Sequence, residues 1–226
     1  MNMMIRKWTA LAVAAVLVAS VATTAVAAPP FTTIPGAVYA DEHAKGLNRA
    51  HEAIFGELQK HGVKDVKADD YFAGSITVLL EAGLLQPDAN GNLNPNGTLS
   101  DDDGIAIFAR VLGVASKTDT SAQATEKARQ AGLLGDDITL DGQLSRLEVA
   151  KLLGRALGIN PKPVFVPAGF PFVGEFEQLS PDERGLLQAL YEFGVFKGYP
   201  DRTFRPGNTL TRAEIAILVD RILGGQ

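Results

Sequence analysis

The sequence predicts a mainly α-helical fold, made of three helix–loop–helix copies that pack together around a shared centre. Three segments end alike, with a hydroxyl residue 13 positions before a glycine: Ser100 to Gly113, Ser145 to Gly158 and Thr211 to Gly224. In each segment the apolar residues recur at the spacing of a helix packed on one face. One helical hairpin cannot bury its own apolar stripe, so we expect the three copies to cover one another.

Residues 1–27 have the pattern of a secretory signal peptide. Arg6 and Lys7 form a basic start, the run from Trp8 to Val21 carries no charge, and Ala25-Val26-Ala27 is a small-x-small cleavage site. A membrane anchor is the alternative, but the apolar run is shorter than the ~20 residues that a bilayer span needs. The sequence therefore predicts a secreted chain without a membrane span after cleavage.

Residues 28–64 are predicted to be an N-terminal extension with one amphipathic helix. That helix is expected over residues 41–62, where the apolar side chains Leu47, Ile54, Phe55 and Leu58 fall on one side. We expect it to cover core that the repeats leave exposed.

The three copies follow in order, and a proline-rich connection separates the last two. Copy one spans residues 65–115 and copy two spans 116–160, with a loop four residues shorter. The connection at residues 161–174 contains Pro161, Pro163 and Pro171, which favour an extended backbone. Copy three spans residues 175–226.

The second helix of each copy carries its own start signal. Ser100, Ser145 and Thr211 are predicted N-caps, because each is a hydroxyl residue with an acid three positions later. Ser145 with Glu148 and Thr211 with Glu214 have the capping-box pattern. Leu93 and Phe204, at matching positions in the preceding loops, are expected to insert into the core.

Composition excludes several classes of function. Loss of residues 1–27 changes the formal net charge from −5 to −7, which disfavours nucleic acid as a partner. The chain has no cysteine, and its three histidines lack the spacing of a zinc site. The loop from Asp88 to Asn94 does not place a glycine and a bidentate glutamate where a calcium loop needs them. No cofactor, metal or enzyme activity is predicted.

The loop and helix of copy three resemble a known family. The run Gly198-Tyr199-Pro200-Asp201-Arg202-Thr203-Phe204-Arg205-Pro206, followed by Thr211-Arg212-Ala213-Glu214, is similar to the GYPDGTFRP and TRAE signatures of S-layer homology (SLH) domains. The resemblance covers residues 175–226 best, 65–115 less well, and 116–160 mainly through Ser145-Arg146-Leu147-Glu148. It implies a pseudo-threefold helical bundle whose inter-repeat grooves hold secondary cell-wall polymer, an anionic and often pyruvylated glycan.

The resemblance also implies which residues bind the glycan. They are the residues that match the two signatures, together with the aromatic residue before the first helix of copy one: Arg212, Arg146, Glu214, Gly198, Tyr199, Asp201, Thr211, Ser145 and Tyr71. Arg146 and Arg212 occupy the first helical position, where a cation meets the positive end of the helix dipole unfavourably. We expect them to bind a carboxylate together with free N–H groups of the helix N-terminus.

Other members of this set have a structural interpretation beside the binding one. Glu148 and Glu214 are expected to act chiefly as caps, and Asp201 chiefly as a turn residue. Tyr199 and Tyr71 are candidates either for stacking on a sugar or for packing in the core.

The sequence departs from the family at three places. Asp101 stands where the other copies have arginine, copy two lacks a GYPDG-like turn, and Trp8 in the signal peptide is the single tryptophan. Two hypotheses follow. The chain binds wall glycan through the remaining grooves and thereby anchors itself to the wall and S-layer, or it is a degenerate SLH scaffold that binds an envelope protein partner.

Overall fold

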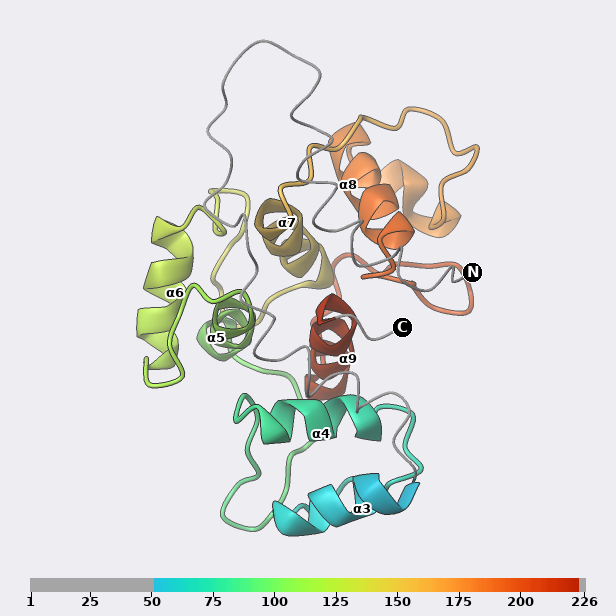
Figure 1. The fold of residues 1–226 in the computed structure, drawn as a ribbon. Helices are drawn as coiled ribbons and strands as arrows, with labels where there is room; N and C mark the ends of the chain where they lie inside the picture. The colour runs from blue at the N-terminus through green and yellow to red at the C-terminus, as the bar shows by residue number, and fades with distance from the viewer. Residues whose placement is uncertain (1–50, 224–226) are drawn as a thin grey trace, which may run out of the picture.

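A computed structural model describes residues 51–223, and these residues are mainly α-helical, as predicted (Figure 1). The helices are α3 (His51–Lys60), α4 (Ala73–Glu81), α5 (Asp101–Val111), α6 (Ser121–Gln130), α7 (Arg146–Ala156), the 3₁₀ helix η2 (Val173–Gln178), α8 (Pro181–Glu192) and α9 (Arg212–Ile222). The described residues form isolated β-bridges but no strand. The predicted signal peptide and residues 28–50 lie outside them, so only the part of the predicted 41–62 helix from residue 51 onward is described.

The predicted caps start the second helix of each copy. The hydroxyls of Ser100, Ser145 and Thr211 each accept a hydrogen bond from the backbone N–H three residues later. Reciprocal capping boxes join Ser145 to Glu148 and Thr211 to Glu214. Each such cap contributes about 1 kcal/mol to helix stability, so the start of each helix is set locally by the sequence.

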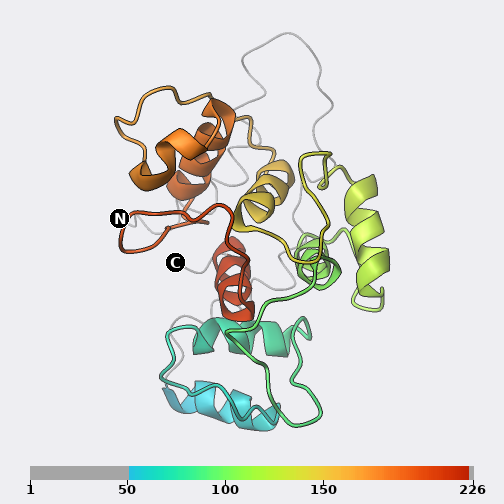
Figure 2. The ribbon, with the colours of Figure 1, turned by 180° about the vertical axis from the view of Figure 1, so that it is seen from behind.

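The helices pack in a cyclic order that crosses the copy boundaries. The second helix of each copy contacts the first helix of the next: α5 lies against α6, α7 against α8, and α9 returns to α4. Figures 1 and 2 show α9 meeting α4 while α5 and α7 lie beside it at the centre. The helix α3 covers α4 on the outside. The three copies therefore form a closed arrangement rather than a linear array.

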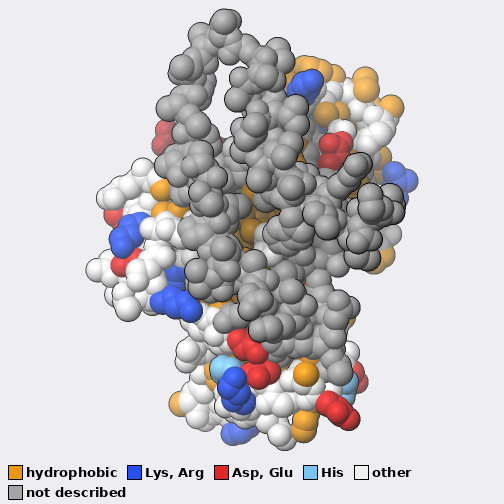
Figure 3. All heavy atoms as spheres, in the orientation of Figure 1, with side chains coloured by type: hydrophobic (Ala, Val, Ile, Leu, Met, Phe, Trp, Pro, Cys, Tyr) orange, Lys and Arg blue, Asp and Glu red, His pale blue; other side chains and the backbone are white. Residues whose placement is uncertain are grey.

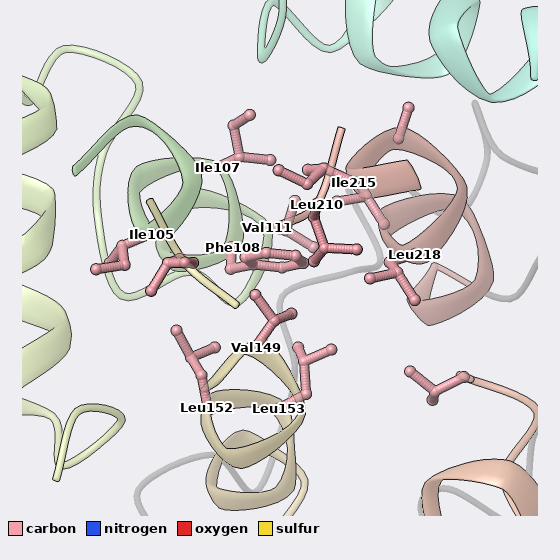
Figure 4. Packing of buried hydrophobic residues seen from close by; sticks show 14 of the residues in the cluster. Ile105, Ile107, Phe108, Val111, Val149, Leu152, Leu153, Leu210, Ile215 and Leu218 are labelled. Atoms are coloured by element: carbon pink, nitrogen blue, oxygen red, sulfur yellow. The ribbon is translucent and has the colours of Figure 1, made fainter. Parts of the chain in front are cut away.

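Apolar side chains of the three second helices converge on the centre. Figure 4 shows Phe108 and Val111 of α5, Val149 and Leu153 of α7, and Leu218 of α9 pointing toward one another. All five are almost fully buried. The apolar stripe read from the sequence thus faces the interior in every copy.

The loops of copies one and three have matching backbones. Gly91 and Arg202 occupy equivalent positions with φ of 88° and 63°, and Asn94 and Arg205 do so with φ of 50° and 60°. Leu93 and Phe204, which directly precede Asn94 and Arg205, are buried in the core as predicted.

The connection between copies two and three adds a small aromatic core. Phe170 and Phe172 are buried against each other edge to face, and Phe172 also contacts Phe204 of the copy-three loop. The middle of this connection remains exposed, with Phe165 71% accessible. Hydrophobic side chains are visible on the surface over the region of α8 (Figure 3).

Candidate functional site

The start of each second helix lies on the loop of a neighbouring copy. Backbone N–H groups of Arg212 and Ala213 donate to the carbonyls of Gly97 and Pro95 in copy one. Those of Arg146 and Leu147 donate in the same way to Asn208 and Pro206 in copy three. The N–H of Asp101 donates to Gly142 in copy two.

These bonds correct the expected mode of anion binding. At α7 and α9 the first two N–H groups are taken by the neighbouring loop, and the third is taken by the Ser145 or Thr211 hydroxyl. The expectation that the helix N-termini offer these groups to an anion was therefore wrong. Any anion at these junctions must be bound by side chains.

Arg146 is buried between copies two and three, with 6% of its surface accessible. Its Nε donates to the Phe204 carbonyl at 2.9 Å, and its Nη1 donates to Glu214 Oε1 at 3.0 Å. The guanidinium lies 5.1 Å from the centre of the Phe204 ring. Burial lowers the pKa of Arg146, while Tyr199 and Glu214 act to raise it. Arg146 therefore holds the copy-three loop in place.

Tyr199 belongs to the same buried network. Its hydroxyl donates to Glu214 Oε1 at 2.7 Å, and burial together with this bond raises its pKa. The guanidinium carbons of Arg146 and Arg205 lie 4.8 and 3.9 Å from the centre of its ring. A sugar can stack on this ring only where neither guanidinium covers it.

Asp201 and Gly198 shape the copy-three turn. The Asp201 carboxylate accepts hydrogen bonds from the backbone and hydroxyl of Thr203 and pairs with Arg205, which together lower its pKa to about 2. Gly198 has a φ of 69°, and a β-carbon there would lie 2.9 Å from the Thr203 carbonyl oxygen. Both residues therefore have the turn-forming role that their types favour.

Arg212 differs from Arg146, although the two occupy equivalent positions. Its side chain is partly exposed and extends over the copy-one loop, where a β-carbon placed on Gly97 would lie 2.8 Å from Arg212 Nη1. Within residues 51–223 its guanidinium has no ion pair and donates no hydrogen bond. Among the described residues, the Arg212 guanidinium is therefore an uncommitted cation at the junction of copies three and one.

Asp101 makes the third junction acidic. It is 7% accessible; its Oδ2 accepts from Gly142 N–H at 2.6 Å, and its Oδ1 has no partner. Burial, together with the charges of Asp141, Glu148 and Asp102, raises its pKa. The carboxylates at this junction act against the approach of an anion.

The predicted site residues do not form one cluster. Arg146, Tyr199, Glu214 and Thr211 are joined by hydrogen bonds, whereas within residues 51–223 no side-chain hydrogen bond, ion pair or ring contact joins Arg212 or Tyr71 to them. The Tyr71 side chain is 82% accessible and meets Phe72 edge to face. Ser145 is the N-cap of α7 and is paired by a β-bridge with Thr209 of copy three.

Two acids that support the loops were not identified from the sequence. Asp65 accepts from the N–H groups of Leu93 and Asn94, and the buried Glu175 accepts from those of Phe204 and Arg205. Each acid precedes the first helix of its copy. An acid shortly before each first helix, 18 residues before Gly83 in copy one and 19 before Gly194 in copy three, is the sequence signal that could have revealed them.

Within residues 51–223 no three His, Cys, Asp or Glu side chains are placed to hold a metal ion. No helix in this part of the chain has the length and apolar character to cross a bilayer.

Comparison with known proteins identifies the repeat. The sequence profile of the S-layer homology domain matches residues 64–100 and 187–216, which lie in copies one and three. The chain is 25% identical over 177 residues to the Surface-layer 125 kDa protein of Lysinibacillus sphaericus, covering 70% of this chain and 14% of that protein.

Two other relatives have similar names. The Cell surface protein of Thermoanaerobacter kivui is 30% identical over 108 residues, covering 47% of this chain and 14% of the relative. The S-layer protein sap of Bacillus anthracis is 27% identical over 168 residues, covering 67% of this chain and 20% of the relative. The chain thus spans a fifth or less of the length of these relatives. Copies one and three thus contain S-layer homology domain sequence, and this match together with the relatives indicates a secreted protein associated with the cell wall and S-layer.

Proposed function

We propose that this protein binds secondary cell-wall polymer non-covalently and thereby anchors itself to the wall, without catalysing a reaction. The main support for this proposal is that the Arg212 guanidinium, at the junction of copies three and one, makes no ion pair or hydrogen bond within residues 51–223. The polymer is an anionic glycan that bears carboxylate groups, of which a pyruvylated sugar is an example. The S-layer homology match and the surface-layer relatives support an anchoring role.

The chemistry of Arg212 suits a carboxylate. A guanidinium presents parallel N–H groups that match the two oxygens of a carboxylate, and such charge-assisted bonds are stronger than neutral ones. The protein as a whole is acidic, so a local cation has to provide the attraction at short range. Partial burial against Gly97 restricts the Arg212 side chain, which reduces the entropy lost on binding.

The three junctions have different roles in this proposal. Arg146 is committed to Glu214 and Phe204, so Arg146, Glu214, Thr211 and Tyr199 keep the copy-three loop in shape. The Asp101 junction disfavours anions. Tyr71, exposed before α4, is free to stack on a sugar ring. Attachment to an anionic polymer therefore depends mainly on one junction.

Sedimentation with purified wall sacculi tests the proposal. We expect the protein to sediment with intact sacculi and to remain in solution after the secondary polymer is stripped from them. Arg212→Gln should weaken binding about tenfold, the loss of one charge-assisted pair. Arg129→Gln is the matched control, since Arg129 is an exposed arginine on the outer helix α6. Equal recovery from intact and stripped sacculi would exclude glycan binding.

A protein-binding scaffold is the second candidate. The exposed apolar side chains of the connection, Phe165 and Val166, are suited to an envelope protein rather than to an anionic glycan. If Arg146→Met and Arg212→Gln leave wall localisation unchanged while Phe165→Ser abolishes it, this second function is favoured.

A further inference from the structure

An apolar loop projects from the connection between copies two and three, at residues 165–169. Figures 1 and 2 show this part of the chain, between α7 and η2, extending past α8 at the edge of the molecule. Phe165 and Val166 have 71% and 61% of their surfaces accessible, and Pro167 and Ala168 are exposed beside them. Adjacent apolar side chains that are this exposed are a feature of contact surfaces, whereas single ones need no explanation.

The 165–169 loop is fixed at its first end by a buried arginine. The Val164 N–H donates to the Pro181 carbonyl at 2.9 Å, and the Val164 carbonyl accepts from Arg184 Nη1 at 3.2 Å. Arg184 is 8% accessible, and its Nε donates to the Phe176 carbonyl at 2.7 Å. Its guanidinium lies 3.7 Å from the centre of the Phe176 ring. Buried contacts therefore hold the chain directly before the loop.

The second end of the loop is fixed by aromatic packing. The Phe170 N–H donates to the Pro167 carbonyl at 3.1 Å, and the rings of Phe170 and Phe172 are buried with their centres 5.8 Å apart. Because both ends are fixed, the exposed side chains have less conformational entropy to lose on binding. The loop is therefore a preorganised apolar surface.

The sequence around this loop differs in charge from the rest of the protein. Residues 149–174 are the longest stretch without Asp or Glu after residue 27. Of the acids that follow, Glu175 is buried and Glu183 is paired with a lysine of α7. An acidic protein repels its own copies. That repulsion is weakest where each copy presents an apolar surface that lacks acids.

We propose that the 165–169 loop binds the same loop of a second copy of this chain, so that two copies pair about a twofold axis. A twofold contact has the same surface on both sides, so Phe165 and Val166 of each copy are buried against those of the other. Lys162 and Asp182, beside the residues that fix the loop, form no ion pair within residues 51–223. Across the axis, the lysine of one copy pairs with the aspartate of the other. This pairing does not depend on glycan binding.

Sedimentation velocity of the purified secreted chain tests the inference. We expect the dimer fraction to rise over about a hundredfold increase in protein concentration, and to rise with added salt, which screens the repulsion between acidic copies. Phe165→Ser should weaken self-association about tenfold or more, since each copy loses the burial of one aromatic side chain. Phe55→Ser is the matched control, because Phe55 is half exposed on α3, far from α8 in Figure 1.

Cross-linking gives an independent measurement, because the chain has no cysteine. Ala168→Cys introduces one thiol in the loop, which should form a disulfide-linked dimer on mild oxidation. Ala122→Cys, at an exposed alanine of α6, should remain monomeric at the same concentration.

Three results would each overturn the inference: a monomer at every concentration, equal weakening by Phe165→Ser and Phe55→Ser, or equal cross-linking of the two thiols. Loss of wall localisation in Phe165→Ser, with no dimer of the purified parent chain, would also overturn it and would assign the loop to a different protein.

Discussion

Arg146 and Glu214 are joined by an ion pair of 3.0 Å that ties α7 of copy two to α9 of copy three. Both residues belong to TRAE-like starts, yet here they bind each other across a copy boundary. Glu214 also caps its own helix and accepts from the Tyr199 hydroxyl. The Glu214 carboxylate thus connects the start of α9, the copy-three loop and α7 of copy two.

Arg146 and Arg212 should therefore respond differently to substitution. Arg146→Ala leaves the Glu214 carboxylate without its ion-pair partner, so we expect a loss of about 3 kcal/mol in the free energy of unfolding. Arg212→Ala should change it by less than about 0.5 kcal/mol, as at other exposed sites. Urea denaturation followed by far-ultraviolet circular dichroism measures both. Equal losses would contradict the structural difference between the two arginines.

Arg202 occupies a backbone conformation that suits glycine, with a φ of 63°. Arg202→Gly should stabilise the protein by about 1 kcal/mol, because a left-handed backbone costs a residue with a β-carbon roughly that amount. Gly91→Ala, at the equivalent position in copy one, should do the reverse, since the added carbon would lie 2.5 Å from the Gly62 carbonyl oxygen. Thermal unfolding of the two variants should shift in opposite directions.

Asp101 should make the protein less stable as pH rises. Because burial raises its pKa in the folded state above the ordinary aspartate value of 3.8, the folded protein binds this proton more tightly than the unfolded chain. Stability is thus lost as pH rises from about 4 through the folded pKa. Asp101→Asn should be more stable than the parent by about 1 kcal/mol at pH 7, with the difference vanishing near pH 4. Asp136→Asn, which removes one negative charge from an exposed position, is the control.

Glu175 should stabilise the conformation of the copy-three loop. Its buried carboxylate accepts from the N–H groups of Phe204 and Arg205, so Glu175→Ala leaves two donors unpaired at a cost of about 2 kcal/mol or more. Hydrogen exchange of the Phe204 amide should accelerate. Glu175→Gln, which keeps one acceptor oxygen, should restore part of the protection; no change at Phe204 would show that the loop is held elsewhere.

The fold was largely predictable because its signals are local. Capping pairs such as Ser145 with Glu148 set helix starts within four residues, and apolar periodicity sets the buried face. No local sequence pattern indicated which first helix each of α5, α7 and α9 contacts. That order depends on which surfaces fit together once the helices exist.

The site was less predictable, because identical motifs meet different neighbours. Arg146 and Arg212 have the same position in sequence, but Arg146 meets Glu214 and Phe204 whereas Arg212 lies beside Gly97 of the copy-one loop. The bonding of helix N–H groups to neighbouring loops was missed for the same reason. The residue types at a helix start do not indicate which backbone carbonyls of another copy will accept its N–H groups.

The contact between α9 and α4 has a consequence for how the native state is reached. A linear repeat array can grow one unit at a time, because each unit is complete once its neighbour is present. Here the carbonyls of Pro95 and Gly97 accept the N–H groups of Ala213 and Arg212 in α9, which follows all the other described helices in the chain. A product that lacks α9 is therefore left with an open interior, and loss of this one helix to a protease would unfold all three copies together.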